Sequence, residues 1–339
     1  MDKLIPKVLI ISTTLFAILL SPIAYPADYR LDVSLDTSPN HIRNQSFRQF
    51  AQLISKKSNG RLELRIFDSA SKYKGPNVAT AVAQGAIDMA APAQQHLSKY
   101  IPNAGLLLLP MFYGLEREKI YLIVDGPLGQ QLNKEIEEKL RIIVLGRPFD
   151  LGYGTVFSTQ KRITTPSDMQ GMKVRVPGGA ATVARYKVFG STPTQIAWSD
   201  VPQALQTGTV SSIWATQESV ASAKLWDSGI RYAFEDKQAV IEYVPIISAK
   251  AWNKLPADLQ TLLRTTWEDM VDEVRQAAFD KQRHATELNK QHGIETIIPT
   301  QQDLNMMREK LLKQQPAIIK KLKMNPIYIQ QVQDQLNAS

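Results

Sequence analysis

Cysteine is absent from the 339-residue sequence, and its absence excludes several kinds of chemistry at once. Without a thiol the chain has no disulfide, thiolate nucleophile, iron–sulfur cluster or zinc–thiolate site. Its stability therefore depends on a hydrophobic core. A chain of this length, with 44% hydrophobic and 21% charged residues, is long enough for one large domain or two ordinary ones.

The common catalytic and phosphate-binding motifs are missing too. The sequence has no G-x-S-x-G, G-x-x-x-x-G-K-[ST] or H-E-x-x-H, and no G-x-G-x-x-G follows a strand. The four histidines are scattered, and His284 and His292 are too far apart for a metal pair on one helix. We therefore expect no catalytic centre, no metal site and no cofactor.

A long apolar run stands near the N-terminus, where residues 8–20 read VLIISTTLFAILL. Lys3 and Lys7 precede it and small residues up to Ala27 follow, which is the layout of a secretory signal peptide. The run is shorter than the ~20 residues that a spanning helix needs, and an uncleaved anchor is the alternative. We assign residues 1–27 to a signal peptide and expect a periplasmic protein of a Gram-negative bacterium.

Basic residues exceed acidic ones, with a formal charge of +8. The signal peptide contributes a net +1, so the mature chain carries about +7. Such a surplus favours anionic partners. Nucleic acid is not expected, because export removes the chain from DNA and no basic run is interleaved with aromatic residues.

Alternating strand and helix patterns indicate an α/β fold. Residues 29–36 and 61–68 alternate apolar and polar side chains, and the helical pattern between them ends at Gly60. A helix–glycine–strand unit around Gly85 completes the order β-α-β-α-β. A similar unit at residues 204–213 predicts a second lobe, so we expect two lobes with a mixed sheet in each.

A long helical tract follows, from residue 256 to residue 292. As one helix it would be about 55 Å long, which exceeds one lobe, so we expect it to span both. One strand is predicted over residues 141–150, and two more helices and a polar tail are predicted at the C-terminus. The expected division is lobe I at residues 28–152, lobe II at 153–240, return strands at 241–255, the long helix at 256–292, and C-terminal helices packed on the lobes at 293–339.

Arg175, in the stretch GMKVRVPGG, is the leading candidate for binding, and the nearby Pro177 is a further candidate. Alternation places it opposite Val174 and Val176, and Pro177 ends the strand directly after it. Ligands of open α/β sheets bind at the carboxyl ends of strands, and a guanidinium offers paired donors that match a carboxylate. The alternative is an ion pair with an acidic residue of the chain.

Further candidates lie at other predicted strand ends. His41 comes just after the first strand, and Ala91 adjoins the strand at residues 86–90. Aromatic side chains also gather at such ends, although each of them could belong to the core. These aromatic candidates are Phe112, Phe149, Trp198 and Trp214.

With these residues in place, the chain resembles the DctP-type solute-binding proteins of tripartite ATP-independent periplasmic (TRAP) transporters. The resemblance rests on AVAQGAIDMAAP, TTPSDMQGMKVRVP, FGSTPTQIAWSDVPQALQTGTV and the LPADLQ helix start. It implies two lobes that close on an organic acid anion and deliver it to a permease with a small and a large membrane subunit. It implies no chemical conversion.

In that family the arginine of the K-x-R-x-P block pairs with the ligand carboxylate, and here it is Arg175. The family's asparagine contact falls near Ala215 within SSIWATQES, where Thr216 or Gln217 could replace it. Together with Trp214, this departure predicts a monocarboxylate with an apolar or aromatic body. We expect a monomer, because the exposed face of the long helix is charged. The alternatives are a binding subunit of an ATP-driven importer or sensor, or a periplasmic enzyme acting on an acid.

Overall fold

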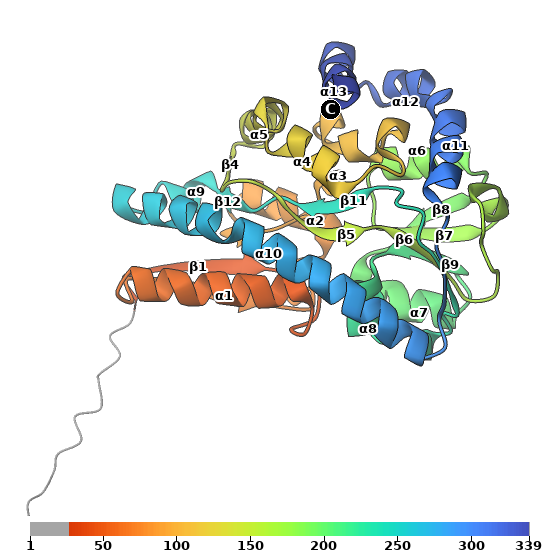
Figure 1. Cartoon of the computed structure of the whole chain (residues 1–339). Coiled ribbons are helices and arrows are strands. Elements are labelled where there is room, and N and C mark those ends of the chain that lie inside the picture. Colours follow the sequence, from red (N-terminus) through yellow and green to blue (C-terminus); the bar gives the residue numbers. More distant parts are fainter. Residues whose placement is uncertain (1–26, 339) are drawn as a thin grey trace, which may run out of the picture.

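The structure, a computed structural model, describes residues 27–338, so the predicted signal peptide lies outside the described residues except for Ala27. The chain forms two α/β lobes, each built on a mixed sheet, with a two-stranded ribbon between them (Figure 1). The predicted fold class is confirmed.

The sheet of lobe I has the strand order β2-β1-β3-β12-β4. β1 runs parallel to both β2 and β3, whereas β12 is antiparallel to β3 and β4. The alternating pattern of the first strand buries Leu31 and Val33 against the core. The strands are β1 Tyr29–Ser34, β2 Leu62–Phe67, β3 Met89–Ala90, β4 Ile142–Val144 and β12 Ile246–Ser248.

The sheet of lobe II has the order β13-β10-β6-β9-β7-β8. β7 lies between β8 and β9 and is parallel to both, while β6 is antiparallel to β9 and β10. β13 returns from late in the chain to pair with β10. The strands are β6 Thr155–Ser158, β7 Lys173–Val176, β8 Thr192–Gln195, β9 Ser212–Ala215, β10 Tyr232–Phe234 and β13 Glu295–Ile297.

The ribbon between the lobes consists of β5 (Phe149–Tyr153) and β11 (Val240–Tyr243), which pair antiparallel. The prediction of one strand over residues 141–150 is therefore wrong. Two strands occupy this stretch, β4 in the sheet of lobe I and the start of β5 in the ribbon. Gly146 and Pro148 separate them, since proline has no N–H for a sheet hydrogen bond.

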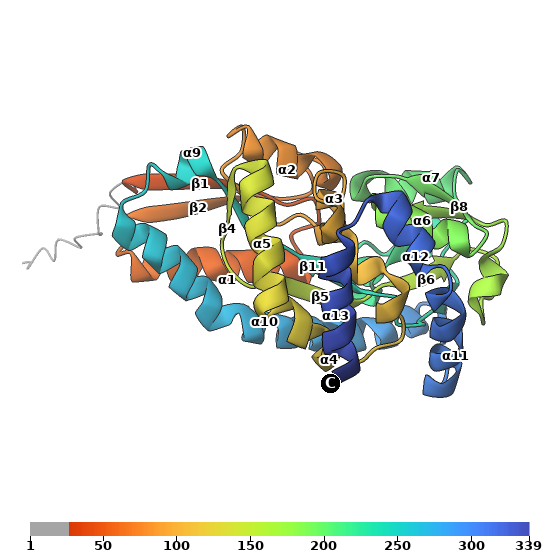
Figure 2. The same ribbon diagram turned by 90° about the horizontal axis from the view of Figure 1, so that it is seen from above.

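Helices cover both sheets and the ribbon (Figure 2). The α-helices before the long one are α1 Ile42–Lys57, α2 Gly75–Ala83, α3 Gln94–Leu97, α4 Arg117–Val124, α5 Pro127–Leu140, α6 Ala180–Val188, α7 Val201–Gln206, α8 Gln217–Ser222 and α9 Ala249–Trp252. The 3-10 helices are η1 Pro102–Leu108, η2 Pro110–Phe112, η3 Pro166–Met169, η4 Trp198–Asp200 and η5 Leu225–Ser228.

The long helix α10 (Ala257–Gln291) crosses the whole molecule (Figure 1). In its first half the Trp267 ring packs against that of Phe47 in α1, with the ring centroids 5.7 Å apart. Near its end Asn289 donates a hydrogen bond to the carbonyl of Gln217 in lobe II. α10 thus holds both lobes. Across residues 27–338, no helix is both long enough and apolar enough to cross a membrane.

The C-terminus contains three helices, α11 (Gln301–Leu312), α12 (Gln315–Leu322) and α13 (Pro326–Ala338). The prediction of two helices and a polar tail is wrong at this point. The last residues continue as helix α13 because Tyr328, Ile329 and Val332 form an apolar stripe that is buried against the protein. α12 contacts α6, and α13 contacts α4 and α5.

Candidate functional site

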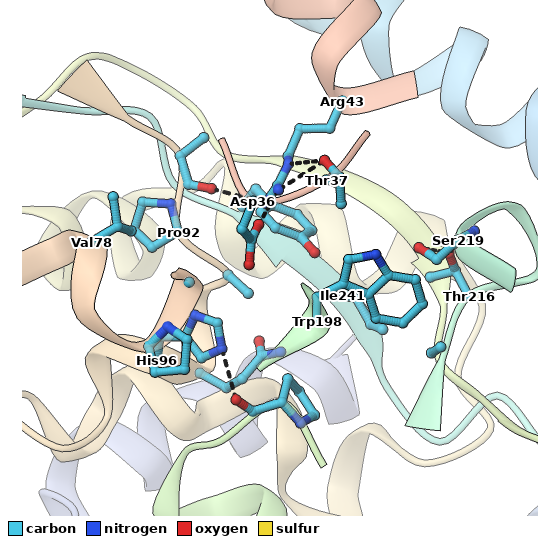
Figure 3. Close-up of a pocket in the computed structure, with 18 of the residues that line it drawn as sticks. Asp36, Thr37, Arg43, Val78, Pro92, His96, Trp198, Thr216, Ser219 and Ile241 are labelled. Carbon is cyan, nitrogen blue, oxygen red and sulfur yellow. Dashed lines mark hydrogen bonds and ion pairs between the residues drawn. The ribbon is translucent and has the colours of Figure 1, made fainter. Parts of the chain in front are cut away.

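A cavity lies between the two lobes, and its wall is built from strand ends (Figure 3). Lobe I contributes the segments that follow β1 and β3 and the start of α2. Lobe II contributes the carboxyl ends of β7 and β9 together with η4. Ile241 and Tyr243 of the ribbon close the remaining side. The site therefore joins all three parts of the fold.

Arg175 projects from β7 into the wall of this cavity and is only 3% exposed. Its Nε donates to the carbonyl of Ile196 (2.9 Å) and its Nη1 to that of Trp214 (3.1 Å). Within residues 27–338 it forms no ion pair. Burial lowers the pKa of Arg175 to about 10, although the nearby carboxylate of Asp36 opposes this shift. At neutral pH the wall thus carries a buried positive charge that has no ion-pair partner among the described residues.

Arg185, in α6, provides an instructive contrast. It is also buried, and burial lowers its pKa to about 10 as well. All three of its nitrogens, however, donate to carbonyls, those of Leu108, Leu109 and Gln238. Arg185 does not line the cavity and ties α6 to η1. Arg175 therefore differs from Arg185, because one side of its guanidinium is free and faces the cavity, whereas Arg185 only supports the fold.

Aromatic and small residues of lobe II surround Arg175. The Trp198 ring lies 5.4 Å from the guanidinium carbon, within range of a cation–π contact. Trp214 lies against Gly154, where a Cβ atom would be 2.1 Å from the indole Nε1, so only glycine fits there. Thr216 accepts from the backbone N–H of Ser219 and caps α8.

A charged cluster forms the opposite wall, in lobe I. Arg43 pairs with Asp36 and donates from Nη2 to Thr37 Oγ1 (2.9 Å), as Figure 3 shows. The Arg43 guanidinium also covers the Tyr243 ring at 4.6 Å. Burial by itself raises the pKa of Asp36, but Arg43 outweighs it and holds that pKa below its usual value. The two charges therefore offset each other.

His96 connects the two walls. Its Nε2 donates to the carbonyl of Pro177 at 3.1 Å, which links α3 of lobe I to the residue that ends β7 (Figure 3). Burial lowers the pKa of His96 to about 4, so the ring is neutral at physiological pH. The described structure thus has its lobes in direct contact around the cavity.

The structure brings together seven of the eleven residues that the sequence marks as ligand-binding candidates. The cavity is lined by Ala91, Arg175, Pro177, Trp198, Trp214, Ala215 and Thr216. The other four candidates do not line it. Of the two alternatives to the family's asparagine, Thr216 is the one at the wall, while Gln217 bonds to Glu235 and Asn289.

The remaining three candidates are fully buried elsewhere. Phe112 belongs to the core of lobe I. Phe149 stands one layer behind the wall, with its ring 5.7 Å from that of Tyr243. His41 caps α1 by accepting from the N–H of Arg43, and its Nε2 lies 3.0 Å from Ser219 Oγ and 2.9 Å from Glu218 Oε2. It thereby joins the lobes beside the cavity.

Sequence reasoning missed the polar groups of lobe I, chiefly Asp36, Thr37, Arg43 and His96. A signal for the first two was present, because Asp36 ends the first predicted strand and Thr37 follows it, and ligands bind at such ends. Arg43 lies seven residues beyond Asp36, and only the turn into α1 brings the two together. This cluster adds polar groups to the cavity wall beyond the residues named from the sequence.

Comparison with known proteins gives a consistent result. The model of the DctP family, described as bacterial extracellular solute-binding protein, family 7, matches residues 33–321. A solute-binding protein of Chromohalobacter salexigens is 25% identical over 296 residues, covering 87% of this chain and 82% of that protein. The C4-dicarboxylate-binding periplasmic protein DctP of Rhodobacter capsulatus is 24% identical over 289 residues, 84% of each chain.

The fold matches solved structures as well. A TRAP periplasmic solute-binding protein from Desulfovibrio salexigens, with bound orotic acid, aligns with a TM-score of 0.83 at 20% sequence identity. The alignment covers 91% of this chain and 99% of that one. At this level of identity the match establishes a shared two-lobed fold.

Proposed function

Because the chain belongs to family 7 of the bacterial extracellular solute-binding proteins, as its sequence motifs predicted, we propose that it is a periplasmic receptor for an organic acid anion. The observation that carries this proposal is Arg175, a buried cation in the cavity wall that forms no ion pair with any described residue. A bound carboxylate would supply the counter-charge and match the paired N–H donors.

The charge balance of the wall supports a ligand with a single carboxylate. Asp36 offsets Arg43, and His96 is neutral, so Arg175 leaves one net positive charge. The adjacent Trp198 ring supports an apolar or aromatic ligand body. Proteins similar to this chain bind dicarboxylates and aromatic acids alike. One relative is named for C4-dicarboxylates, and one structural neighbour holds orotic acid, a heteroaromatic carboxylic acid.

Delivery to a TRAP permease is the second part of the proposal. Contacts between the lobes, such as His96 with Pro177, change when the lobes open or close, and so does the surface offered to a membrane partner. The permease would thereby distinguish the loaded receptor from the empty one. Adjacent genes for one small and one large membrane subunit would support this part, and a gene for an ATPase in their place would contradict it.

Thermal-shift measurements on the mature protein test the binding function. We expect at least one monocarboxylate from a panel of aliphatic and aromatic mono- and dicarboxylates to raise the melting temperature with increasing concentration. Arg175→Ala should unfold cooperatively and show no shift. Arg162→Ala is the control, because Arg162 pairs with Glu295 on the surface. Normal binding by Arg175→Ala would refute the clamp, and binding of C4-dicarboxylates alone would refute the monocarboxylate.

A further inference from the structure

Two hydrogen-bond acceptors in the lobe I wall lie close together without a donor. They are Asp36 Oδ2 and His96 Nδ1, and both residues line the cavity. A Cβ atom built on Gly75 would be 2.3 Å from Asp36 Oδ2 and 3.0 Å from Cε1 of His96, the ring carbon bonded to both ring nitrogens. The glycine at this position leaves room for the two groups to converge.

The first acceptor is free because Arg43 engages the other oxygen of the carboxylate. Arg43 Nη2 donates to Oδ1 of Asp36, and no other described residue donates to Oδ2. The ion pair fixes the orientation of the carboxylate and offsets its charge. Asp36 thus presents one oriented acceptor to the cavity.

The second acceptor follows from the tautomer of His96. Its Nε2 faces the carbonyl oxygen of Pro177, which only accepts, so Nε2 carries the proton. Nδ1 is therefore an unprotonated acceptor, and it is buried without a partner among the described residues. An unpaired buried acceptor of this kind is costly unless something donates to it.

We propose that this pair is a hydroxyl-binding subsite, so that the ligand is a hydroxy acid whose carboxylate meets Arg175 and whose hydroxyl donates to Asp36 Oδ2 or His96 Nδ1. The inference rests on the proposed function, because it presumes a carboxylate at Arg175. His96 bonds to Pro177, two residues beyond Arg175, so the acceptors and the clamp lie close enough for a small ligand.

Charge selects a hydroxyl over the other groups that could meet the pair. A second carboxylate has no proton to donate and would face two acceptors, one of them charged. An ammonium can donate, but the wall already holds Arg43 and Arg175 with only Asp36 to balance them. A hydroxyl donates without adding charge, so it satisfies an acceptor and leaves the balance of the cavity unchanged.

Isothermal titration with matched acids tests the subsite. The wild-type mature protein is titrated with four pairs of a hydroxy acid and its deoxy partner. The pairs are lactate and propionate, 3-hydroxybutyrate and butyrate, 4-hydroxybutyrate and butyrate, and 4-hydroxybenzoate and benzoate. 4-Aminobutyrate and succinate are titrated as well, because they carry an ammonium or a second carboxylate in place of the hydroxyl. We expect at least one hydroxy acid to bind about tenfold tighter than its deoxy partner, since an acceptor left unpaired costs about that much. 4-Aminobutyrate and succinate should bind more weakly than this hydroxy acid.

Two variants locate the effect. His96→Phe keeps an aromatic ring but has no acceptor, and Asp36→Asn weakens the other acceptor. We expect at least one of them to reduce the hydroxy-to-deoxy affinity ratio toward one. The ratio is the readout because either substitution can also change how tightly the carboxylate itself binds. His284→Phe, on the exposed face of α10, is the matched control and should keep the ratio. If Asp36→Asn fails to fold because Arg43 loses its partner, His96→Phe decides the question.

The outcomes separate this inference from the function on which it rests. Deoxy acids that bind as tightly as hydroxy acids, a ratio unchanged in both variants, or a preference for 4-aminobutyrate or succinate would each refute the hydroxyl subsite. Carboxylate binding that depends on Arg175 would leave the receptor function standing in these cases. If no organic acid binds at all, the receptor function fails together with the subsite.

Discussion

Arg175 and Trp214 are joined by a hydrogen bond from the guanidinium Nη1 to the Trp214 carbonyl, 3.1 Å long. The two residues belong to neighbouring parallel strands, β7 and β9. With the bond from Nε to Ile196, this contact fixes the plane of the guanidinium before any ligand arrives. Such preorganisation reduces the conformational entropy that binding has to overcome.

Replacing Arg175 with lysine tests whether this fixed plane matters. We expect Arg175→Lys to bind the preferred acid at least about 100-fold more weakly, because an ammonium keeps the charge but cannot form two parallel hydrogen bonds. Isothermal titration measures the loss. An affinity within about threefold of the wild type would mean that charge alone accounts for binding, contrary to the paired-donor geometry.

An ion pair between Lys74 and Asp200 bridges the lobes at the rim of the cavity. Lys74 Nζ lies 2.9 Å and 2.7 Å from the two carboxylate oxygens, and both side chains are about half exposed. The neighbouring residues Gly75 and Trp198 line the cavity. The pair therefore stabilises the closed arrangement, although solvent and salt screen it.

We expect Lys74→Ala to raise the dissociation rate of a bound acid by up to about fivefold, since an exposed pair contributes at most about 1 kcal/mol. Stopped-flow tryptophan fluorescence provides the rate. High salt should shrink the difference from the wild type, and the exchange Lys74→Asp with Asp200→Lys should restore slow release. Equal rates at low salt in Lys74→Ala and the wild type would show that the pair does not hold the lobes.

Gly154 should resist substitution, because a Cβ atom there would be 2.1 Å from the Trp214 indole nitrogen. We expect Gly154→Ala to lower the free energy of unfolding by about 1–3 kcal/mol through overpacking. Urea denaturation measures the change. Combining it with Trp214→Phe, which removes the colliding ring atoms, should recover part of the loss. If Gly154→Ala alone were as stable as the wild type, the Trp214 side chain would be able to shift at little energetic cost.

Glu242 should make stability depend on pH. It lies opposite Asp150 in the ribbon, 1% exposed, and neither of its carboxylate oxygens accepts a hydrogen bond from a described residue. Burial raises its pKa from 4.5 to about 8. Between these values the folded protein retains a proton that the unfolded chain releases, so this carboxyl lowers the stability as the pH rises from 4.5 to 8.

Glu242→Gln removes that titration. Relative to the wild type, the variant should therefore gain stability between pH 5 and pH 8, by at most about 1.4 kcal/mol for each pH unit. Urea denaturation at several pH values measures the difference, and Glu295→Gln on the surface serves as control. A constant difference between variant and wild type across this range would show that Glu242 ionises normally.

Local sequence signals account for much of the fold. The period-two alternation at Leu31 and Val33, the apolar stripe of α10 and the glycine stops depend on neighbours in the chain, so strands and helices could be predicted from them. The same holds for Arg175, because the alternation of its strand and Pro177 directly after it place the side chain at a carboxyl end.

The partners of these side chains depend on contacts between distant segments, which no local pattern encodes. Only the packing of the lobes decides whether Arg175 has an acidic partner. It also brings His96 to Pro177, which is 81 residues away in the sequence. His41 satisfies the same strand-end rule as Asp36, yet it turns back to cap α1, while Asp36 faces the cavity. Side-chain direction at a strand end is decided by the hydrogen bonds available around it, and the folded chain alone supplies those.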